Sequence, residues 1–242
     1  MSILSVDFHT HILPGIDDGC PNVVEAVQML QMEYTQGVKK VFFTPHFHAD
    51  VDYPDDFIAK RKQAFDTLVD KIETDKDYPE LILGAEVRFC PGMSAWEQLN
   101  MLTLGDTGYI LIEMPNAVWG EEVYAELESI YKNRNLIPIL AHVERYFVPF
   151  RTHAMLRRFR ALPLCLQYNC DFFIERRTRN LARKLLSKGF VDVIGSDCHS
   201  ATWRAPNIQQ AREEILDFVD EASVRIIERN EQMISQSRYV KE

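Results

Sequence analysis

The sequence predicts an α/β fold in which helices cover a set of parallel strands, arranged as a barrel or as a doubly wound sheet. Seven short apolar runs recur along the chain, and stretches with apolar residues at helical spacing alternate with them. Neither nucleotide-binding fingerprint, G-x-G-x-x-G or G-x-x-x-x-G-K-[ST], occurs in the sequence. The doubly wound sheet therefore lacks its usual supporting motif.

The strands are predicted from runs that are apolar almost throughout, as expected for parallel strands covered on both faces. The runs are Ile3–His9, Lys40–Thr44, Leu81–Gly84, Tyr109–Ile112, Ile137–Ala141, Leu164–Tyr168 and Val191–Gly195. The first predicted helix, Asn22–Gln36, begins with Asn22 and has Glu25 three residues later, which is an N-cap signature, and Gly37 ends it. Similar spacing predicts helices at Asp56–Ile72, Ala117–Asn133, His153–Leu162, Arg179–Lys188 and Ile208–Val219.

The composition is that of an ordinary soluble protein and excludes several classes. The net charge of −9 argues against broad binding of nucleic acid or anionic membranes. No apolar run approaches the ~20 residues of a membrane span, and the N-terminal sequence shows no signal peptide. The five cysteines form no C-x-x-C pair, which favours reduced thiols. We therefore expect a cytoplasmic protein.

Residues that bind metals follow the predicted strands. Barrel enzymes place their catalytic groups at the carboxyl ends of the strands, and five of the seven histidines lie there. Asp17 and Asp18 are adjacent, and only one of them need be a ligand. The predicted ligands are His9, His11, Asp18, His46, Glu86, Glu113, His142, Asp197 and His199.

This set predicts a site with several metal ions. His-x-His or Asp-x-His alone is a weak signal, but carboxylates gathered at one face are costly to bury unless cations neutralise them. Mixed imidazole and carboxylate ligands suit Mn, Fe or Zn better than Ca or Mg. Four carboxylates and five neutral imidazoles carry −4, so three divalent ions would bring the site to +2. That charge suits a phosphate dianion.

Two arginines lie close to these ligands in sequence. Arg145 follows His142 by three residues, and Arg204 follows His199 by five. A planar guanidinium group binds phosphate oxygens well. We therefore predict that both arginines bind substrate in a metal-dependent phosphate-ester hydrolase. The hypothesis is that hydroxide generated by the metals attacks phosphorus in line while the arginines stabilise the developing charge.

The segment from Cys170 to Arg176 has the C-x5-R spacing of thiol-based phosphatases. That loop needs small residues so that backbone N–H groups can surround the phosphate, and it needs an electropositive setting for the thiolate. Here it contains two phenylalanines, two acidic residues and no glycine. We interpret the match as a coincidence.

The order of these motifs resembles the PHP superfamily (polymerase and histidinol phosphatase) from about Asp7 to Pro206. Within it, the sequences Ile16-Asp17-Asp18-Gly19 and Ala141-His142-Val143-Glu144-Arg145-Tyr146 most resemble bacterial protein-tyrosine phosphatases of the CpsB/YwqE type. The resemblance implies a distorted (β/α)7 TIM-like barrel, with residues 1–242 as a single domain. It also selects Asp18 from the aspartate pair and assigns phosphate binding to Arg145 and Arg204.

The resemblance further implies three metal ions, typically manganese. His9, His11, Glu86 and Asp197 would bind one ion, and Glu86 would bridge to a second ion bound by Glu113 and His142. Asp18, His46 and His199 would bind the third. The implied substrate is phosphotyrosine, often on the Tyr-rich tail of a bacterial tyrosine autokinase that controls capsule or exopolysaccharide synthesis.

Two other functions remain open at this point. The loop at residues 47–56 is acidic, and an acidic entrance would favour a cationic substrate, as in a small-molecule phosphatase of the histidinol-phosphate type. A non-catalytic metal-binding partner of the kinase is the second alternative. The sequence assigns no role to the C-terminal tail at residues 238–242.

Overall fold

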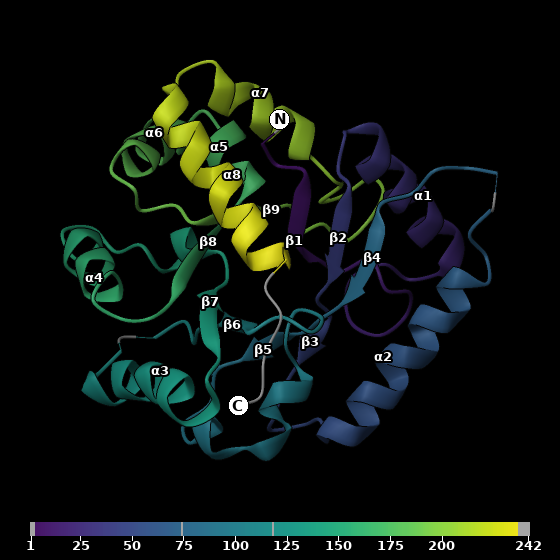
Figure 1. The fold of residues 1–242 in the computed structure, drawn as a ribbon, viewed down its shortest axis with the longest axis horizontal. Coiled ribbons are helices and arrows are strands. Elements are labelled where there is room, and N and C mark those ends of the chain that lie inside the picture. The colour runs from purple at the N-terminus through teal and green to yellow at the C-terminus, as the bar shows by residue number, and fades with distance from the viewer. Residues whose placement is uncertain (1–2, 74, 118, 237–242) are drawn as a thin grey trace.

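The computed structural model describes residues 3–73, 75–117 and 119–236. Within these residues every strand pairing is parallel, and the strands curve around the middle of the molecule with most of the helices outside them (Figure 1). The strands are β1 (Val6–Thr10), β2 (Lys40–Phe43), β3 (His46–Phe47), β4 (Glu80–Leu83), β5 (Glu86–Arg88), β6 (Tyr109–Glu113), β7 (Ile137–Leu140), β8 (Cys165–Asn169) and β9 (Val193–Gly195).

Two interruptions distort the barrel. Strands pair in the orders β1-β2-β4 and β3-β5-β6-β7-β8-β9. Thr44 and Pro45 separate β2 from β3, and Gly84 and Ala85 separate β4 from β5, so each pair of short strands is one interrupted strand. A parallel bridge from Thr10 to Cys198 returns the order to β1. The strands therefore follow one another around a distorted seven-stranded barrel, as predicted.

The helices confirm most of the predicted elements, and they also include two that the sequence pattern did not predict, α5 and α8. The Asn22 side chain accepts a hydrogen bond from the Glu25 backbone N–H at 3.0 Å, as the N-cap signature predicted. The α-helices are α1 (Val23–Thr35), α2 (Pro54–Val69), α3 (Glu121–Arg134), α4 (Thr152–Phe159), α5 (Cys170–Ile174), α6 (Arg179–Ser187), α7 (Ile208–Leu216) and α8 (Glu221–Gln236). Short 3-10 helices cover Met93–Ala95, Glu97–Met101 and Val143–Tyr146.

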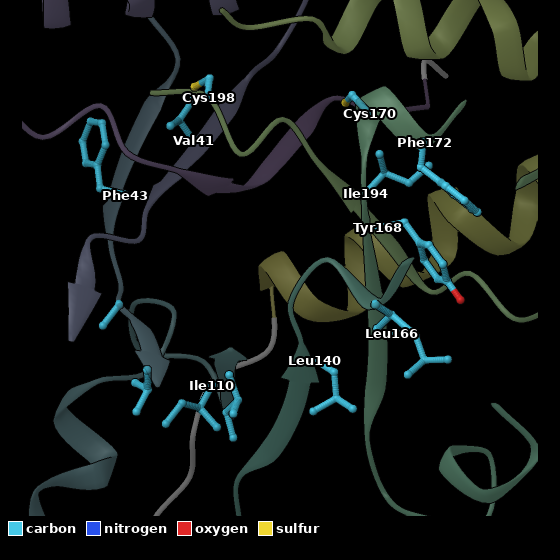
Figure 2. Close-up of a cluster of buried hydrophobic side chains, with 14 of the residues drawn as sticks. Val41, Phe43, Ile110, Leu140, Leu166, Tyr168, Cys170, Phe172, Ile194 and Cys198 are labelled. Atoms are coloured by element: carbon cyan, nitrogen blue, oxygen red, sulfur yellow. The ribbon is translucent and has the colours of Figure 1, made fainter. Parts of the chain in front are cut away.

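Buried side chains on opposite faces of the strands form two layers. Leu111 of β6 and Ile139 of β7 belong to an inner cluster, which Ile234 of α8 joins. Ile110 and Leu140, their neighbours along the same strands, belong to the outer cluster beneath the helices (Figure 2). This separation follows from the alternation of side chains along a strand. The two packed layers fix the strands, and thereby the positions of their carboxyl ends.

Among the described residues, the structure contains no helix with both the length and the apolar character needed to cross a bilayer. The C-terminal residues 238–242, to which the sequence assigned no role, lie outside the described residues.

Candidate metal centre

The nine predicted ligands lie at one edge of the barrel, where the carboxyl ends of the parallel strands meet. They are His9 on β1, His11 just beyond it, Asp18 in the following loop, His46 at the start of β3, Glu86 at the start of β5, Glu113 at the end of β6, His142 after β7, and Asp197 and His199 after β9. The ends of β1 and β9 approach each other closely at Gly195. A side-chain Cβ at this position would lie 2.8 Å from the Cβ of His9. Glycine there lets β9 approach β1.

The first group of donor atoms is almost completely buried. His9 Nε2 and His11 Nε2 lie 3.1 Å apart. Glu86 Oε2 lies 3.2 Å from the first nitrogen and 3.3 Å from the second. Asp197 Oδ1 lies 3.6 Å and 3.5 Å from the same two atoms. The structure thus brings together the four residues that the resemblance assigned to one ion.

The second group shares Glu86 with the first. Glu86 Oε1 lies 2.8 Å from His142 Nε2, and Glu113 Oε1 lies 3.8 Å from the same nitrogen. Glu86 is 1% exposed, whereas the Glu113 side chain is 28% exposed and lies nearer the solvent. The two oxygens of Glu86 therefore face different groups, which is the arrangement of a bridging carboxylate.

The third group lies toward the surface. Asp18 Oδ1 lies 3.4 Å from His46 Nε2 and 3.7 Å from His199 Nε2. His11 also has a ring nitrogen within 4.8 Å of these donor atoms, so it lies between the first and third groups. His199 Nδ1 lies 2.9 Å from the Asp197 backbone carbonyl, which leaves Nε2 directed at the cluster. Asp18, rather than Asp17, faces this group.

The buried donor atoms fit divalent cations. Glu86 Oε2 and His46 Nδ1 are buried and make no hydrogen bond, although they lie 3.0 Å apart. A buried carboxylate oxygen surrounded by imidazole nitrogens needs a positive charge, and either protons or metal ions can supply it. Imidazoles combined with carboxylates are ligands for Mn, Fe and Zn.

The pKa values of three imidazoles in the cluster reflect this competition between protons and metal ions. Burial lowers the pKa of His11, but the carboxylates of Asp17 and Glu86 outweigh burial and raise it to about 9. His46 follows the same pattern, because Glu86 raises its pKa to about 9 against the effect of burial. Burial and the neighbouring His11 lower the pKa of His199 to about 4. The first two imidazoles would therefore bind protons strongly wherever metal ions are removed.

Asp17 holds the ligands of two groups in place, a role that the sequence did not reveal. Its Oδ2 lies 2.7 Å from His11 Nδ1 and accepts the His46 backbone N–H at 3.0 Å. Its Oδ1 accepts the Gly19 N–H at 3.0 Å. A carboxylate on the second ring nitrogen fixes the orientation of a ligating imidazole. Asp17 thus orients the His11 imidazole, whereas its neighbour Asp18 faces the third group of donor atoms.

Gln167 and Asn169 of β8 are further supporting residues. Gln167 Oε1 lies 3.2 Å from His9 Nδ1 and accepts the His142 backbone N–H at 2.7 Å. Asn169 Nδ2 donates to Asp197 Oδ2 at 2.8 Å. Two polar residues at alternate positions of a buried strand were the available signal in the sequence. Neither residue was assigned a role from the sequence.

Two carboxyl groups lie behind the strands. Asp7 Oδ1 accepts the backbone N–H groups of His9 at 3.1 Å and of Ser196 at 3.0 Å, which ties β1 to the end of β9. Glu33 of α1 is fully buried beside Asp7, and burial raises the pKa of Glu33 well above its ordinary value. The pair therefore supports the backbone of the metal centre from the helix side.

The two arginines that are predicted to bind substrate both contact Asp197, one of the predicted metal ligands. Arg145 Nη2 and Arg204 Nη2 each lie 2.5 Å from Asp197 Oδ2. The backbone is left-handed at Arg204 (φ 53), at Asp197 (φ 54) and at His142 (φ 34). Strained residues of this kind gather at functional sites, where the surrounding structure enforces them. Both guanidinium groups are thus beside the predicted metal ligands and partly open to solvent.

Cys170 does not form a thiol-phosphatase loop. Its segment is the short helix α5, and the cysteine is fully buried. Burial raises the pKa of the Cys170 thiol well above its ordinary value, so no thiolate is available at neutral pH. The geometry agrees with the interpretation of the C-x5-R spacing as a coincidence.

Comparison with known proteins gives one consistent result. Residues 5–235 match the family model described as "Capsular polysaccharide synthesis, CpsB/CapC". The chain is 24% identical over 246 residues to the tyrosine-protein phosphatase CpsB of Streptococcus agalactiae, covering 97% of this chain and 100% of that protein. It is 26% identical over 215 residues to the tyrosine-protein phosphatase YwqE of Bacillus subtilis, covering 85% of this chain and 82% of the relative.

The fold has a close counterpart among solved structures. It superposes with a TM-score of 0.80 and 21% identity on a chain from the structures of YwqE from Bacillus subtilis and CpsB from Streptococcus pneumoniae, described as unique metal-dependent tyrosine phosphatases. The match covers 98% of this chain and 97% of that chain. The distorted barrel is therefore shared over nearly the whole length.

Proposed function

Because the chain belongs to the CpsB/CapC family, we propose that it is a metal-dependent protein-tyrosine phosphatase. One observation carries the proposal: buried imidazoles and carboxylates converge directly beside two guanidinium groups. His9, His11 and Glu86 supply donor atoms between 3.1 and 3.3 Å apart. Relatives named as tyrosine-protein phosphatases support the choice of substrate.

We propose three divalent ions, most suitably manganese, with iron or zinc as chemically acceptable replacements. Their ligands would be His9, His11, Glu86 and Asp197 for the first, Glu86, Glu113 and His142 for the second, and Asp18, His46 and His199 for the third. Bound divalent metals polarise a phosphoryl oxygen and lower the pKa of water, so that it becomes a nucleophile at neutral pH.

Arg145 and Arg204 would bind the non-bridging oxygens of the phosphate. Each places a guanidinium nitrogen 2.5 Å from Asp197, at the border between the buried ligands and the solvent. Planar guanidinium groups match phosphate geometry and stabilise negative charge that develops in the transition state. Asp17 and Gln167 would keep the imidazoles of His11 and His9 in the orientation that binding requires.

The biological substrate would be a phosphotyrosine protein, and a bacterial tyrosine autokinase of capsule or exopolysaccharide synthesis is the proposed partner. The family description, capsular polysaccharide synthesis, supports this choice. A cytoplasmic protein, with residues 1–242 acting as one metallophosphatase domain, fits such a role.

The test combines elemental analysis with turnover of a phosphotyrosine peptide. We expect about three metal ions per chain, loss of activity with a chelator, and no loss after alkylation of thiols. Inhibition by alkylation without sensitivity to chelation would overturn the mechanism. Histidinol phosphate serves as the comparison substrate, because faster turnover of that compound would identify a small-molecule phosphatase instead.

A further inference from the structure

A second pocket opens beside the metal centre, lined by residues of α3 and α4 and of the segments that precede them. The two helices are neighbours on the outside of the strands (Figure 1). It has a volume of about 590 Å³, within the usual range for ligand sites. We call it the α3–α4 pocket. It is lined by Asn116, Ala117, Trp119 and Tyr124 from the β6–α3 side, by residues 145–148 after β7, and by Arg151, Thr152, Ala154, Met155 and Arg158 of α4 and its start.

Two neighbouring residues that line the α3–α4 pocket also contact residues of the metal centre. Arg145 lines the pocket and also contacts Asp197 Oδ2 at 2.5 Å. Tyr146 lines the pocket, and its hydroxyl lies 3.3 Å from His142 Nδ1. A phosphate bound by Arg145 would therefore lie at the inner end of the pocket, and chain attached to the phosphorylated residue would extend along it.

Aromatic rings build the inner wall and hold one another in place. The Trp119 ring packs edge-on against Tyr146, with centroids 5.1 Å apart, and against Tyr124, with centroids 6.4 Å apart. Val148, which also lines the pocket, is 50% exposed. The lining thus offers apolar surface to a ligand.

The charge of the α3–α4 pocket is positive, although the whole chain carries −9. Its lining contains three arginines and no acidic residue. Arg145 contacts Asp197, and Arg158 pairs with Glu121 while its guanidinium carbon lies 3.7 Å from the Tyr124 ring centroid. Arg151 is exposed and makes no ion pair within the described part of the chain. Its charge is therefore available to a ligand.

The pocket on the other side of the metal centre is lined by four carboxylates, those of Asp17, Asp18, Asp52 and Glu113, and by two cations, Lys60 and Arg88. Asp18 and Glu113 are proposed metal ligands and Asp17 contacts His11 Nδ1, so these three carboxylates are engaged in the metal centre. A preference for acidic residues of a peptide therefore rests on Arg151 of the α3–α4 pocket, because complementary charge fixes the register in which a partner binds.

We propose that the α3–α4 pocket binds the substrate residues next to the phosphotyrosine and selects an apolar residue accompanied by acidic ones. This inference rests on the proposed function, because it assumes that the metal centre receives the phosphotyrosine itself. The pocket would supply the specificity for the surrounding sequence, which the metal centre does not read.

The experiment compares phosphotyrosine peptides that carry Glu-Leu-Glu, Ser-Leu-Ser or Lys-Leu-Lys on both sides of the phosphotyrosine, and a fourth peptide with Glu-Gly-Glu. For the metal-loaded wild-type protein we expect kcat/KM for the Glu-Leu-Glu peptide to exceed that for the Lys-Leu-Lys peptide by about tenfold, mainly through KM. We also expect a several-fold loss with Glu-Gly-Glu. Equal kcat/KM values for all four peptides would overturn the proposal.

The matched variants are Arg151→Glu and Arg157→Glu, which change the net charge equally. Arg157 is an exposed residue of α4, the helix that begins directly after Arg151, and it does not line the pocket. The readout is the ratio of kcat/KM for the acidic and basic peptides within each variant, so a general loss of activity cancels. We expect Arg151→Glu to abolish or invert the ratio and Arg157→Glu to preserve it. Equal effects of the two variants on this ratio would show that the preference arises from the net charge of the protein and not from Arg151, and would overturn the proposal.

Direct binding separates this inference from the proposed function. Fluorescence anisotropy of the same peptides, made with a phosphonate that resists hydrolysis, reports affinity without turnover. If no peptide is hydrolysed but the acidic peptide binds in a manner that depends on Arg151, the phosphatase proposal fails and the pocket proposal stands. If the peptides are hydrolysed but bind with equal affinity to wild type and Arg151→Glu, the pocket proposal fails alone.

Discussion

The buried floor of the metal centre and its exposed rim follow different physical rules. On the floor, Glu86 is 1% exposed and lies within 3.3 Å of nitrogens from four imidazoles, which come from three different segments of the chain. On the rim, the side chains of Arg145 and Arg204 are 44% and 27% exposed. Charges on the floor depend on one another because solvent cannot replace a missing partner. Charges on the rim are free to serve the substrate.

This difference indicates a division of labour. Under the proposed function, the floor would bind metal ions and set the chemistry, whereas the rim would bind the phosphate and, through the α3–α4 pocket, the surrounding peptide. Substitutions on the floor should therefore remove the metal ions together with the activity. Substitutions on the rim should lower the activity while the metal ions stay bound. The following predictions test this separation.

The largest effect is expected for Glu86→Gln on the floor. The substitution removes the charge that the proposed bridging ligand supplies to two metal ions. We expect metal content to fall and kcat/KM to drop by about a thousandfold, because bound metals stabilise the transition state by several kcal/mol. Elemental analysis and peptide turnover measure the two quantities. Glu73→Gln makes the same chemical change at an exposed position and is the control. Full metal content in Glu86→Gln would contradict the bridging role.

A smaller effect, confined to activity, is expected for Arg145→Ala on the rim. Loss of one group that stabilises transition-state charge costs about 10²-fold in kcat. Metal content should stay at the wild-type value, because Arg145 contacts a ligand only from the solvent side. Arg157→Ala provides the matched control on α4. If Arg145→Ala lost metal ions as well, the arginine would belong to the floor.

Asp17→Asn tests the border between the two regions. An amide in place of the carboxylate weakens the contact with His11 Nδ1, which is 2.7 Å long. Loss of such a supporting group costs about tenfold in metal affinity. Competition with a chromophoric chelator measures the affinity, and Asp75→Asn at an exposed position is the control. An unchanged affinity would show that other contacts suffice to orient the imidazole.

The smallest effect is a pH dependence of stability in metal-stripped protein. The pKa values of His11 and His46 are raised to about 9, above the ordinary value of 6.5. Their stabilising contribution is therefore complete below pH 6.5 and is lost as the pH rises through 9. We expect the Tm to fall by about 2–4 °C for each kcal/mol lost across this window. A flat Tm would mean that carboxylates do not hold these imidazoles in the charged form.

Much of the fold could be predicted from the chain because its signals are local. Apolar strands and helical spacing repeat along the sequence, and α1 begins at the predicted N-cap. The short helix α5 and the C-terminal helix α8 were missed. Five residues are too few for a helical period to show in α5, and we interpreted its segment only through the cysteine spacing. The predicted second and third strands ended at Thr44 and Gly84, and their continuation as β3 and β5 after Pro45 and Ala85 was also missed.

The sequence by itself determined which residue types stand at the ends of the strands. Parallel strands place their carboxyl ends at one edge, so residues far apart in the chain had to meet there. The tertiary structure alone decided how they meet. It gave Asp17 and Asp18 different partners, placed Gln167 between His9 and His142, and gathered arginines beside an aromatic wall between α3 and α4. Those relations depend on distances between segments as many as 158 residues apart, which no local pattern encodes.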